Sequence, residues 1–252
     1  MKKIAILGCV HADFSSVRDF IGAHPDVSEV VCLGDFGFWF SQEEAMKDTT
    51  MWRKCGHKVR TNIDRLNSSK FKTFSIPVHF ITGNHDQYDY TSDEVSKLKD
   101  LNIFPLPRVG IITKFGINIA ILSGIFSPVK FEWELHELSG RLKRFYTRTD
   151  LPLLRNNDKK HISLFLTHEA AKGVMPTGNK SKNRKETDQG TWVPAYILDI
   201  LKPDYYMHAH HHINYKHTGV NDTEIYGLGL LNRDKSSHAI ITVENDSITS
   251  VE

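Results

Sequence analysis

The chain has 252 residues, of which 40% are hydrophobic and 25% carry a charge. This length fits one large hydrophobic core, so we expect a single domain over residues 1–252. The formal net charge of +2 is too small to indicate a nucleic acid or a membrane surface as partner. Three widely spaced cysteines argue against a disulfide framework and favour a cytoplasmic protein.

The start of the chain resembles a secretory signal only in part. Two lysines follow Met1, and residues 4–10 form an apolar run. His11 and Asp13 interrupt this run and no small-residue cleavage pattern follows, so we do not expect a signal peptide. No apolar run reaches the roughly 18 residues of a membrane span, and we expect no membrane segment.

The first half of the chain alternates apolar runs with helix-prone segments. This pattern predicts parallel strands joined by helices, because β-branched apolar runs bounded by turn residues are typical of buried strands. The expected strands cover residues 4–7, 29–33 and 78–82, and the expected helices cover a segment from Ser15 to Ile21 and residues 43–53, 59–70 and 93–101.

The second half combines a predicted hairpin, further strands and one clear helix. Residues 130–155 are polar and helix-prone, and the basic segment 172–188 is expected to be a loop. The helix should cover 192–201 and end before Pro203. The expected strands cover residues 109–113, 117–122, 162–166, 204–207, 224–231, 237–243 and 247–251.

Polar residues of metal-binding types follow the ends of five apolar runs. They are Cys9 with His11, then Asp35, then Asn84 with His85, then His168, and finally His210 with His212. Because ligands of α/β sheets bind at the carboxyl ends of the strands, we expect these side chains to converge. In an extended segment, residues 210 and 212 point to the same face, so both imidazoles can point to one site while His211 points away. His208 shares that face.

Each of these residues also has an ordinary structural explanation. Cys9 fits equally well as a small core residue, and Asp35 as a turn residue after Gly34. A histidine such as His168 most often packs in a core or caps a helix. The histidine-rich run 208–212 is harder to explain by packing, and five coincidences at five strand ends favour a metal site.

Four segments, in this order, resemble those of the calcineurin-like metallophosphoesterases. They are Gly34-Asp35, Gly83-Asn84-His85-Asp86, Thr167-His168 and Ala209-His210-His211-His212. The resemblance extends from Ile4 to about Leu231. It implies an α/β fold of the α+β sandwich type, in which two mixed β-sheets pack face to face and are flanked by helices. It also implies a centre of two divalent metal ions at the strand ends.

The resemblance assigns roles to these residues by position. It implies that the first ion is held by His11, Asp35 and His212, and the second by Asp35, Asn84, His168 and His210. It implies that His85 stabilises charge on the phosphoryl group or protonates the leaving oxygen. We expect Asp86 either to orient His85 by a hydrogen bond or to cap a helix. Substrate-binding residues are not assigned.

Two positions depart from the family pattern. Ala209 stands where the family usually has Gly, and the usual Asp-x-His of the first motif is Cys9-Val10-His11. The cysteine resembles the RNA lariat debranching enzymes, and so do Gly34-Asp35-Phe36, Ser123-Gly124-Ile125-Phe126 and Lys202-Pro203-Asp204-Tyr205. A thiolate at Cys9 would favour Zn or Fe(II), whereas His, Asp and Asn ligands suit Mn, Fe or Zn. We recognise no substrate-recognition insert of that subgroup.

The implied reaction is hydrolysis of a nucleic-acid or nucleotide phosphodiester by hydroxide formed from a water that the two ions share. The alternatives are a phosphomonoesterase of the protein-phosphatase kind and a non-catalytic interaction module. Against the former, Phe36-Gly37-Phe38 stands where such phosphatases carry an Arg.

Basic and aromatic segments leave the substrate open. The basic residues at 141–148 and 180–185 could follow a nucleic-acid backbone or form a solvated surface. The aromatic residues at 36–40 could stack bases or pack in the core. The sequence does not indicate an oligomeric state.

Overall fold

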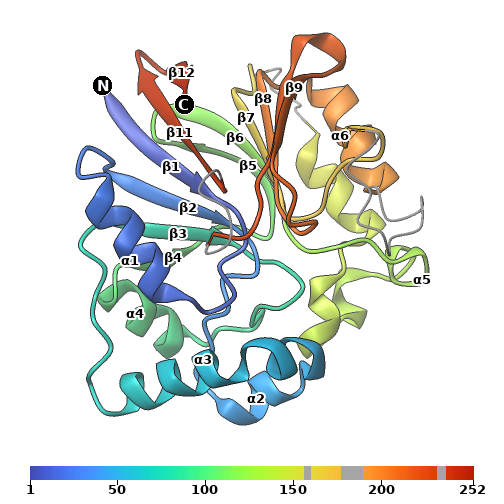
Figure 1. Cartoon of the computed structure of the whole chain (residues 1–252). Coiled ribbons are helices and arrows are strands. Elements are labelled where there is room, and N and C mark those ends of the chain that lie inside the picture. Colours follow the sequence, from blue (N-terminus) through green and yellow to red (C-terminus); the bar gives the residue numbers. More distant parts are fainter. Residues whose placement is uncertain (156–159, 177–189, 232–236) are drawn as a thin grey trace.

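The computed structural model describes residues 1–155, 160–176, 190–231 and 237–252. Two six-stranded mixed sheets pack face to face, and helices cover their outer faces (Figure 1). This arrangement confirms the fold that the resemblance implied. No helix in the described ranges has both the length and the apolar character needed to cross a bilayer.

The first sheet has the strand order β12-β11-β1-β2-β3-β4. Its four strands from β1 to β4 run parallel, and β11 and β12 add an antiparallel pair beside β1. The bounds are β1 Lys2–Leu7, β2 Glu29–Leu33, β3 Val78–Ile81, β4 Ile103–Pro105, β11 His238–Glu244 and β12 Ser247–Val251.

The second sheet has the order β5-β6-β7-β8-β10-β9. Its central strands β6, β7, β8 and β10 run parallel, and β5 and β9 are antiparallel edges. The bounds are β5 Val109–Lys114, β6 Ile117–Leu122, β7 Leu164–Thr167, β8 Tyr205–His208, β9 Tyr215–Thr218 and β10 Glu224–Gly227.

Helices α1 and α4 lie on the outer face of the first sheet, α6 lies on that of the second, and α2 and α3 lie across the strand ends (Figure 1). The bounds are α1 Phe14–Ala23, α2 Gln42–Met46, α3 Thr49–Asn67, α4 Ser92–Asp100, α5 Pro128–Phe131 and α6 Trp192–Leu201. Short 3₁₀ segments cover Leu135–Glu137 (η1), Gly140–Arg144 (η2), Arg148–Leu154 (η3) and Val220–Asp222 (η5).

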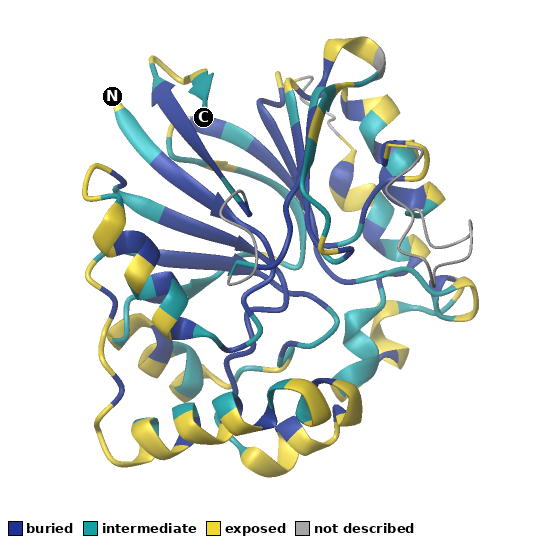
Figure 2. Cartoon of the chain, in the orientation of Figure 1, coloured by how far each residue is buried: buried dark blue, intermediate teal, exposed yellow. Residues whose placement is uncertain are grey.

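Alternation along the strands divides the core into layers. In β1, Ile4 and Ile6 belong to the cluster between the sheets, whereas Ala5 and Leu7 belong to the cluster beneath α1 and α4. Figure 2 shows the central strands buried and the exposed residues concentrated on the helices and loops. Because side chains alternate across a strand, both faces of these strands must be apolar.

Several expected elements differ in the structure. The two helices expected over 43–53 and 59–70 are instead a short α2 and a long α3, because Asp48 accepts a hydrogen bond from the Met51 amide and begins α3 there. The segment 130–155 forms α5 and 3₁₀ turns rather than a long helix, and Pro152 lies inside the last of them. Strands β4 and β9 were not expected.

The parallel strands of both sheets bring their carboxyl ends to one region of the molecule. Strands β1, β2 and β3 of the first sheet end there, next to the ends of β7 and β8 of the second (Figure 1). The loops that follow these five strands carry the polar residues singled out in the sequence. The fold therefore places five loops from distant parts of the chain side by side.

Candidate metal centre

Side chains from the five loops form two groups of potential ligand atoms. The first contains Cys9, His11, Asp35 and His212, the second contains Asp35, His168 and His210, and within each group the donor atoms lie within 4.8 Å of one another. Asn84 joins the second group, because its Oδ1 lies 3.1 Å from Nε2 of His168. The structure thus brings together all seven residues expected to bind metal.

Asp35 lies between the two groups. Its Oδ1 is 3.4 Å from Nε2 of His168, and its Oδ2 is 3.7 Å from Nε2 of His11. Burial alone would raise the pKa of Asp35, but the surrounding imidazoles, with His168 first, outweigh burial and hold that pKa well below its usual range. Asp35 is therefore ionised and directs one oxygen toward each group.

The imidazole nitrogens of the second group lie close to one another. Nδ1 of His168 lies 2.7 Å from the carbonyl oxygen of Leu33, and because a carbonyl only accepts, Nδ1 donates this hydrogen bond and Nε2 is the nitrogen that faces the centre. Nδ1 of His210 lies 3.2 Å from this Nε2. Burial lowers the pKa values of His11 and His210. Imidazoles around one carboxylate form a donor set that fits transition-metal ions.

Four of the expected ligands have an unusual backbone. His11, Asp35, His210 and His212 all have φ between 48° and 62°, a left-handed region that residues other than Gly seldom adopt. This turn geometry directs both His210 and His212 into the centre. The extended conformation expected for 208–212 is therefore wrong. Strand β8 ends at His208, whose Nε2 lies 2.5 Å from the hydroxyl of Tyr215, outside the centre.

Two glycines allow the loops to approach this closely. Gly34 has a φ of 86°, and a Cβ there would lie 2.3 Å from Nδ1 of His168. A Cβ on Gly83 would lie 2.4 Å from Oδ1 of Asp35. Both distances are far below van der Waals contact, so only glycine fits at either position.

Cys9 is fully buried beside Asp35 and His11. Burial, and then the negative charge of Asp35, raise the pKa of the Cys9 thiol well above its ordinary value. Cys9 is therefore a neutral thiol unless a cation offsets these effects. Its amide donates to the carbonyl of Gly229, and its own carbonyl accepts from Leu231, so the backbone position is fixed by strand-like hydrogen bonds.

His85 is held by a residue that sequence analysis missed. Nδ1 of His85 lies 2.7 Å from Oδ2 of Asp48, and the Arg141 guanidinium lies 3.0 Å from the same oxygen. Burial lowers the pKa of His85, but the hydrogen bond to Asp48 and the charge of Asp35 outweigh burial and raise it. The only sequence signal for Asp48 was its suitability as the N-cap of α3.

Asp86 plays neither of its two expected parts. Its carboxylate accepts hydrogen bonds from the amides of Gly37, at 2.6 Å, and Gly83, at 2.7 Å. Asp48 orients His85 instead, and no helix begins at Asp86. Burial and the nearby Asp35 raise the pKa of Asp86 to about 7. Asp86 therefore ties the loop after β2 to the loop after β3.

The aromatic and basic segments near the centre are largely used within the fold. Phe36 and Phe38 are buried in the cluster beneath α1, in agreement with the core-packing alternative. Arg141, Lys143 and Arg148 form ion pairs with Asp48, Asp89 and Glu134, respectively. The basic cluster at 180–185 lies outside the described residues.

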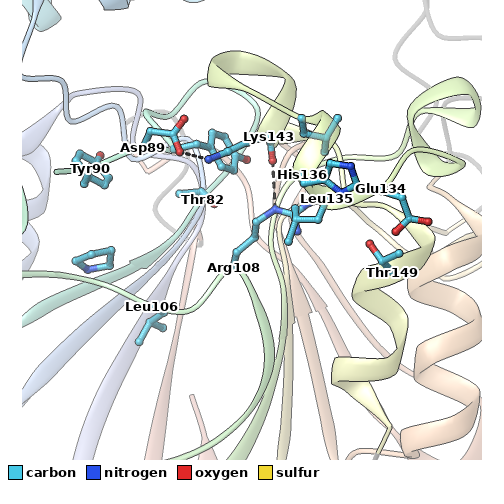
Figure 3. A pocket seen from close by; sticks show the side chains of 13 residues that line it. Thr82, Asp89, Tyr90, Leu106, Arg108, Glu134, Leu135, His136, Lys143 and Thr149 are labelled. Atoms are coloured by element: carbon cyan, nitrogen blue, oxygen red, sulfur yellow. Dashed lines mark hydrogen bonds and ion pairs between the residues drawn. The ribbon is translucent and has the colours of Figure 1, made fainter. Parts of the chain in front are cut away.

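Two pockets lie near the end of β3, and they share no lining residue. One, of about 550 Å³, is lined by His11, Asp35, His85, His210 and His212 together with residues of α3. The other, of about 780 Å³, is larger but contains none of the grouped ligands. In Figure 3 its Lys143 points to Asp89, and its Arg108 is bonded to the backbone of η2. The candidate metal centre therefore opens into the smaller pocket.

Comparison with known proteins agrees with this geometry. The family model described as calcineurin-like phosphoesterase matches residues 2–214. The chain belongs to the calcineurin-like phosphoesterases. It is therefore a member of a family of hydrolases that act on phosphoester bonds, as the sequence resemblance implied.

Distant relatives of this phosphoesterase include lariat debranching enzymes. That of Danio rerio is 25% identical, with 92% of this chain and 45% of the relative covered. The lariat debranching enzyme of Arabidopsis thaliana is 27% identical, and the match covers 84% of this chain and 55% of the relative. The chain thus spans about half the length of the curated relatives it matches.

Solved structures share the fold at low sequence identity. A protein from Thermus thermophilus gives a TM-score of 0.56 at 13% identity, with 100% of this chain and 98% of that chain covered. A dimetal phosphatase from Danio rerio gives a TM-score of 0.52 at 12% identity, and the match covers 97% of this chain and 93% of that chain.

Proposed function

We propose that this phosphoesterase is a metal-dependent phosphodiesterase that hydrolyses a nucleic-acid or nucleotide phosphodiester. The observation that carries the proposal is the position of Asp35, which directs one oxygen to each of two ligand groups while His85 stands in the same pocket. The names of the relatives make RNA the first substrate class to test. The cytoplasmic location and the single domain stay predictions.

The donor atoms fit two divalent ions, for which we propose Mn, Fe or Zn. His11, Asp35 and His212, with Cys9, would hold one ion, and Asp35, Asn84, His168 and His210 would hold the other. Such ions, when bound, activate water and neutralise charge on phosphate oxygens.

The protein's own residues supply the remaining parts of the reaction. His85, whose pKa is raised, holds a proton that it can donate to the leaving oxygen. Asp48 and Arg141 fix the direction of this ring. The amide of His85 donates to Oδ1 of Asp35 at 2.9 Å, which couples the position of the acid to that of the shared carboxylate.

Hydrolysis of bis(4-nitrophenyl) phosphate with Mn, Zn or Fe(II) added, compared with hydrolysis of 4-nitrophenyl phosphate, tests the proposal. We expect turnover of the diester in preference to the monoester, and its loss in His85→Ala and Asp35→Ala. Preference for the monoester would indicate a phosphomonoesterase. Absence of turnover with every metal would indicate a non-catalytic module.

A further inference from the structure

Helix α3 presents a stripe of side chains to the pocket that contains the metal centre. Met51, Lys54, Cys55 and Lys58 line this pocket together with the grouped ligands. Their spacing of three, four and seven residues places them on one side of the helix. Figure 1 shows α3 running across the region where the strands end.

The helix is fastened to the loop that carries His11. Nζ of Lys58 lies 2.7 Å from Oδ2 of Asp13, and Nδ2 of Asn62 donates to the carbonyl of Ala12 at 2.9 Å. Asp13 and Ala12 directly follow His11. The stripe on α3 is therefore held in a fixed position relative to the centre.

Lys54 differs from the other lysine of this stripe, Lys58, in its ion pairing. It is exposed, and within the described part of the chain it forms no ion pair, whereas Lys58 is paired with Asp13. Burial raises the pKa of Cys55, and the charges of Lys58 and Lys54 oppose this effect, so both ammonium groups act on the same part of the pocket. Lys54 is therefore available to an anionic ligand of the pocket.

The charge of the pocket indicates what kind of anion would bind there. A single phosphodiester carries one negative charge, and the metal centre is already suited to bind it. An additional ammonium group beside the centre favours a ligand with a second negative group at a short distance from the first. Consecutive phosphates of a nucleotide chain have this property.

We propose that Lys54, supported by Lys58, binds a second phosphate of the substrate, adjacent to the phosphate that is cleaved. This inference rests on the proposed function and narrows it, because it assigns the enzyme to oligonucleotides rather than to isolated diesters. Lys54 determines specificity, and the bond-breaking step remains with the metal centre and His85.

Binding of two phosphorothioate-linked thymidine dinucleotides, with and without a 5′-phosphate, to the purified full chain in the presence of manganese tests the inference. The phosphorothioate link slows cleavage, so calorimetry reports affinity rather than turnover. We expect the 5′-phosphorylated ligand to bind about 10-fold more tightly, a difference of about 1.4 kcal/mol. This preference should fall to less than about threefold in Lys54→Ala and return in Lys54→Arg.

Arg53→Ala provides the matched control, since Arg53 is an exposed cation on the same helix that does not line the pocket. It should keep the preference of the wild type. An equal preference in Lys54→Ala and wild type, or an equal loss in Arg53→Ala, would overturn the inference. Failure to hydrolyse bis(4-nitrophenyl) phosphate would instead refute the proposed function, and the binding ratio would still decide the role of Lys54.

Discussion

His85 and Asp48 show how a single residue pair can set the chemistry of the pocket. The imidazole is buried enough to lose its charge, yet the carboxylate at 2.7 Å keeps its pKa raised. A group that must donate a proton near neutral pH needs this balance. The pair therefore predicts a measurable dependence of turnover on pH.

In Asp48→Asn, the alkaline limb of the kcat profile should move to lower pH. If His85 is the acid that we propose, it can donate only while protonated, so activity should fall above its pKa. Removal of the Asp48 charge should lower that pKa. A pH–rate profile of diester hydrolysis measures this shift. In a separate variant, His85→Asn, loss of the proton donor should lower kcat by about 10²–10⁴-fold. Asp89→Asn, which removes an exposed carboxylate outside the centre, is the control. An unchanged alkaline limb in Asp48→Asn would refute the role of this pair.

Cys9 should act as a metal ligand despite its raised pKa. Cation binding offsets the burial that keeps the thiol neutral, so the cobalt-loaded protein should show a thiolate-to-cobalt charge-transfer band in its absorption spectrum. The band should be absent in Cys9→Ser and retained in Cys55→Ser, which alters the cysteine that lines the pocket. A band that persists in Cys9→Ser would show that Cys9 is a packing residue only.

The expected ligands could be found from sequence because each one directly follows a strand, where position along the chain predicts position in space. Asp48 could not be found in this way. It reaches His85 from the start of α3, across a separation of 37 residues, and nothing local to Asp48 specifies that contact. The extended backbone expected for residues 208–212 was wrong because the chain turns through left-handed conformations at His210 and His212.

At the scale of elements, the loops after the strands should tolerate fewer substitutions than the strands themselves. Strands β1, β2 and β3 are mostly apolar on both faces and should tolerate exchange of similar residues, whereas the loops combine left-handed residues with glycines packed against the expected ligands. Asp86 links two of these loops through the Gly37 and Gly83 amides. Substitutions in the loops should therefore affect metal binding and stability together.

Gly34→Ala should lower stability by about 1–3 kcal/mol and weaken metal binding, because the new Cβ would overlap His168 at a left-handed position. Chemical denaturation measures the first effect, and metal titration the second. Gly22→Ala is the matched control, since Gly22 lies in α1 and a Cβ there meets no atom within 4 Å. It should leave stability unchanged or raise it by up to about 1 kcal/mol. Equal behaviour of the two variants would contradict the packing argument.

Strand alternation and helix spacing were sufficient to predict most elements of the two sheets. The segment 130–155 was the main exception, because its helix-forming composition is overridden by contacts such as Arg108 with Asp150 and Arg141 with Asp48. Such contacts join residues far apart in sequence, and the composition of the segment 130–155 cannot predict them. Strand β4 was missed because a three-residue edge strand containing Pro105 resembles a turn.

At the scale of the whole molecule, the sandwich is stabilised by three apolar layers with a few charged groups enclosed at their edges. Glu29 at the start of β2 is one of these groups. Its carboxylate lies 2.6 Å from Nε2 of His79 on β3 and also pairs with Lys2 on β1. It therefore joins three adjacent strands of the first sheet.

Glu29 should make the fold sensitive to acid. Burial would raise its pKa, but hydrogen bonds from His79 and Lys2 outweigh burial and lower the pKa from 4.5 to about 2. The ionised Glu29 carboxylate therefore stabilises the fold at pH values above 4.5, and this stabilisation is lost as the pH falls toward 2. Urea unfolding should show Glu29→Gln less stable than wild type near neutral pH, with the difference shrinking in acid. Glu132→Gln, at an exposed site, is the control, and a difference independent of pH would contradict this account.

Metal content per chain tests the central claim most directly, because the fold, the loops and His85 all converge on a centre for two ions. Elemental analysis of the protein purified without chelator and dialysed against Mn or Zn should give roughly two ions per chain. Asp35→Ala should give fewer than one, since both groups share this carboxylate. His24→Ala, which alters a histidine far from the centre, should retain two. Less than one ion in the wild type, or an unchanged content in Asp35→Ala, would contradict the account.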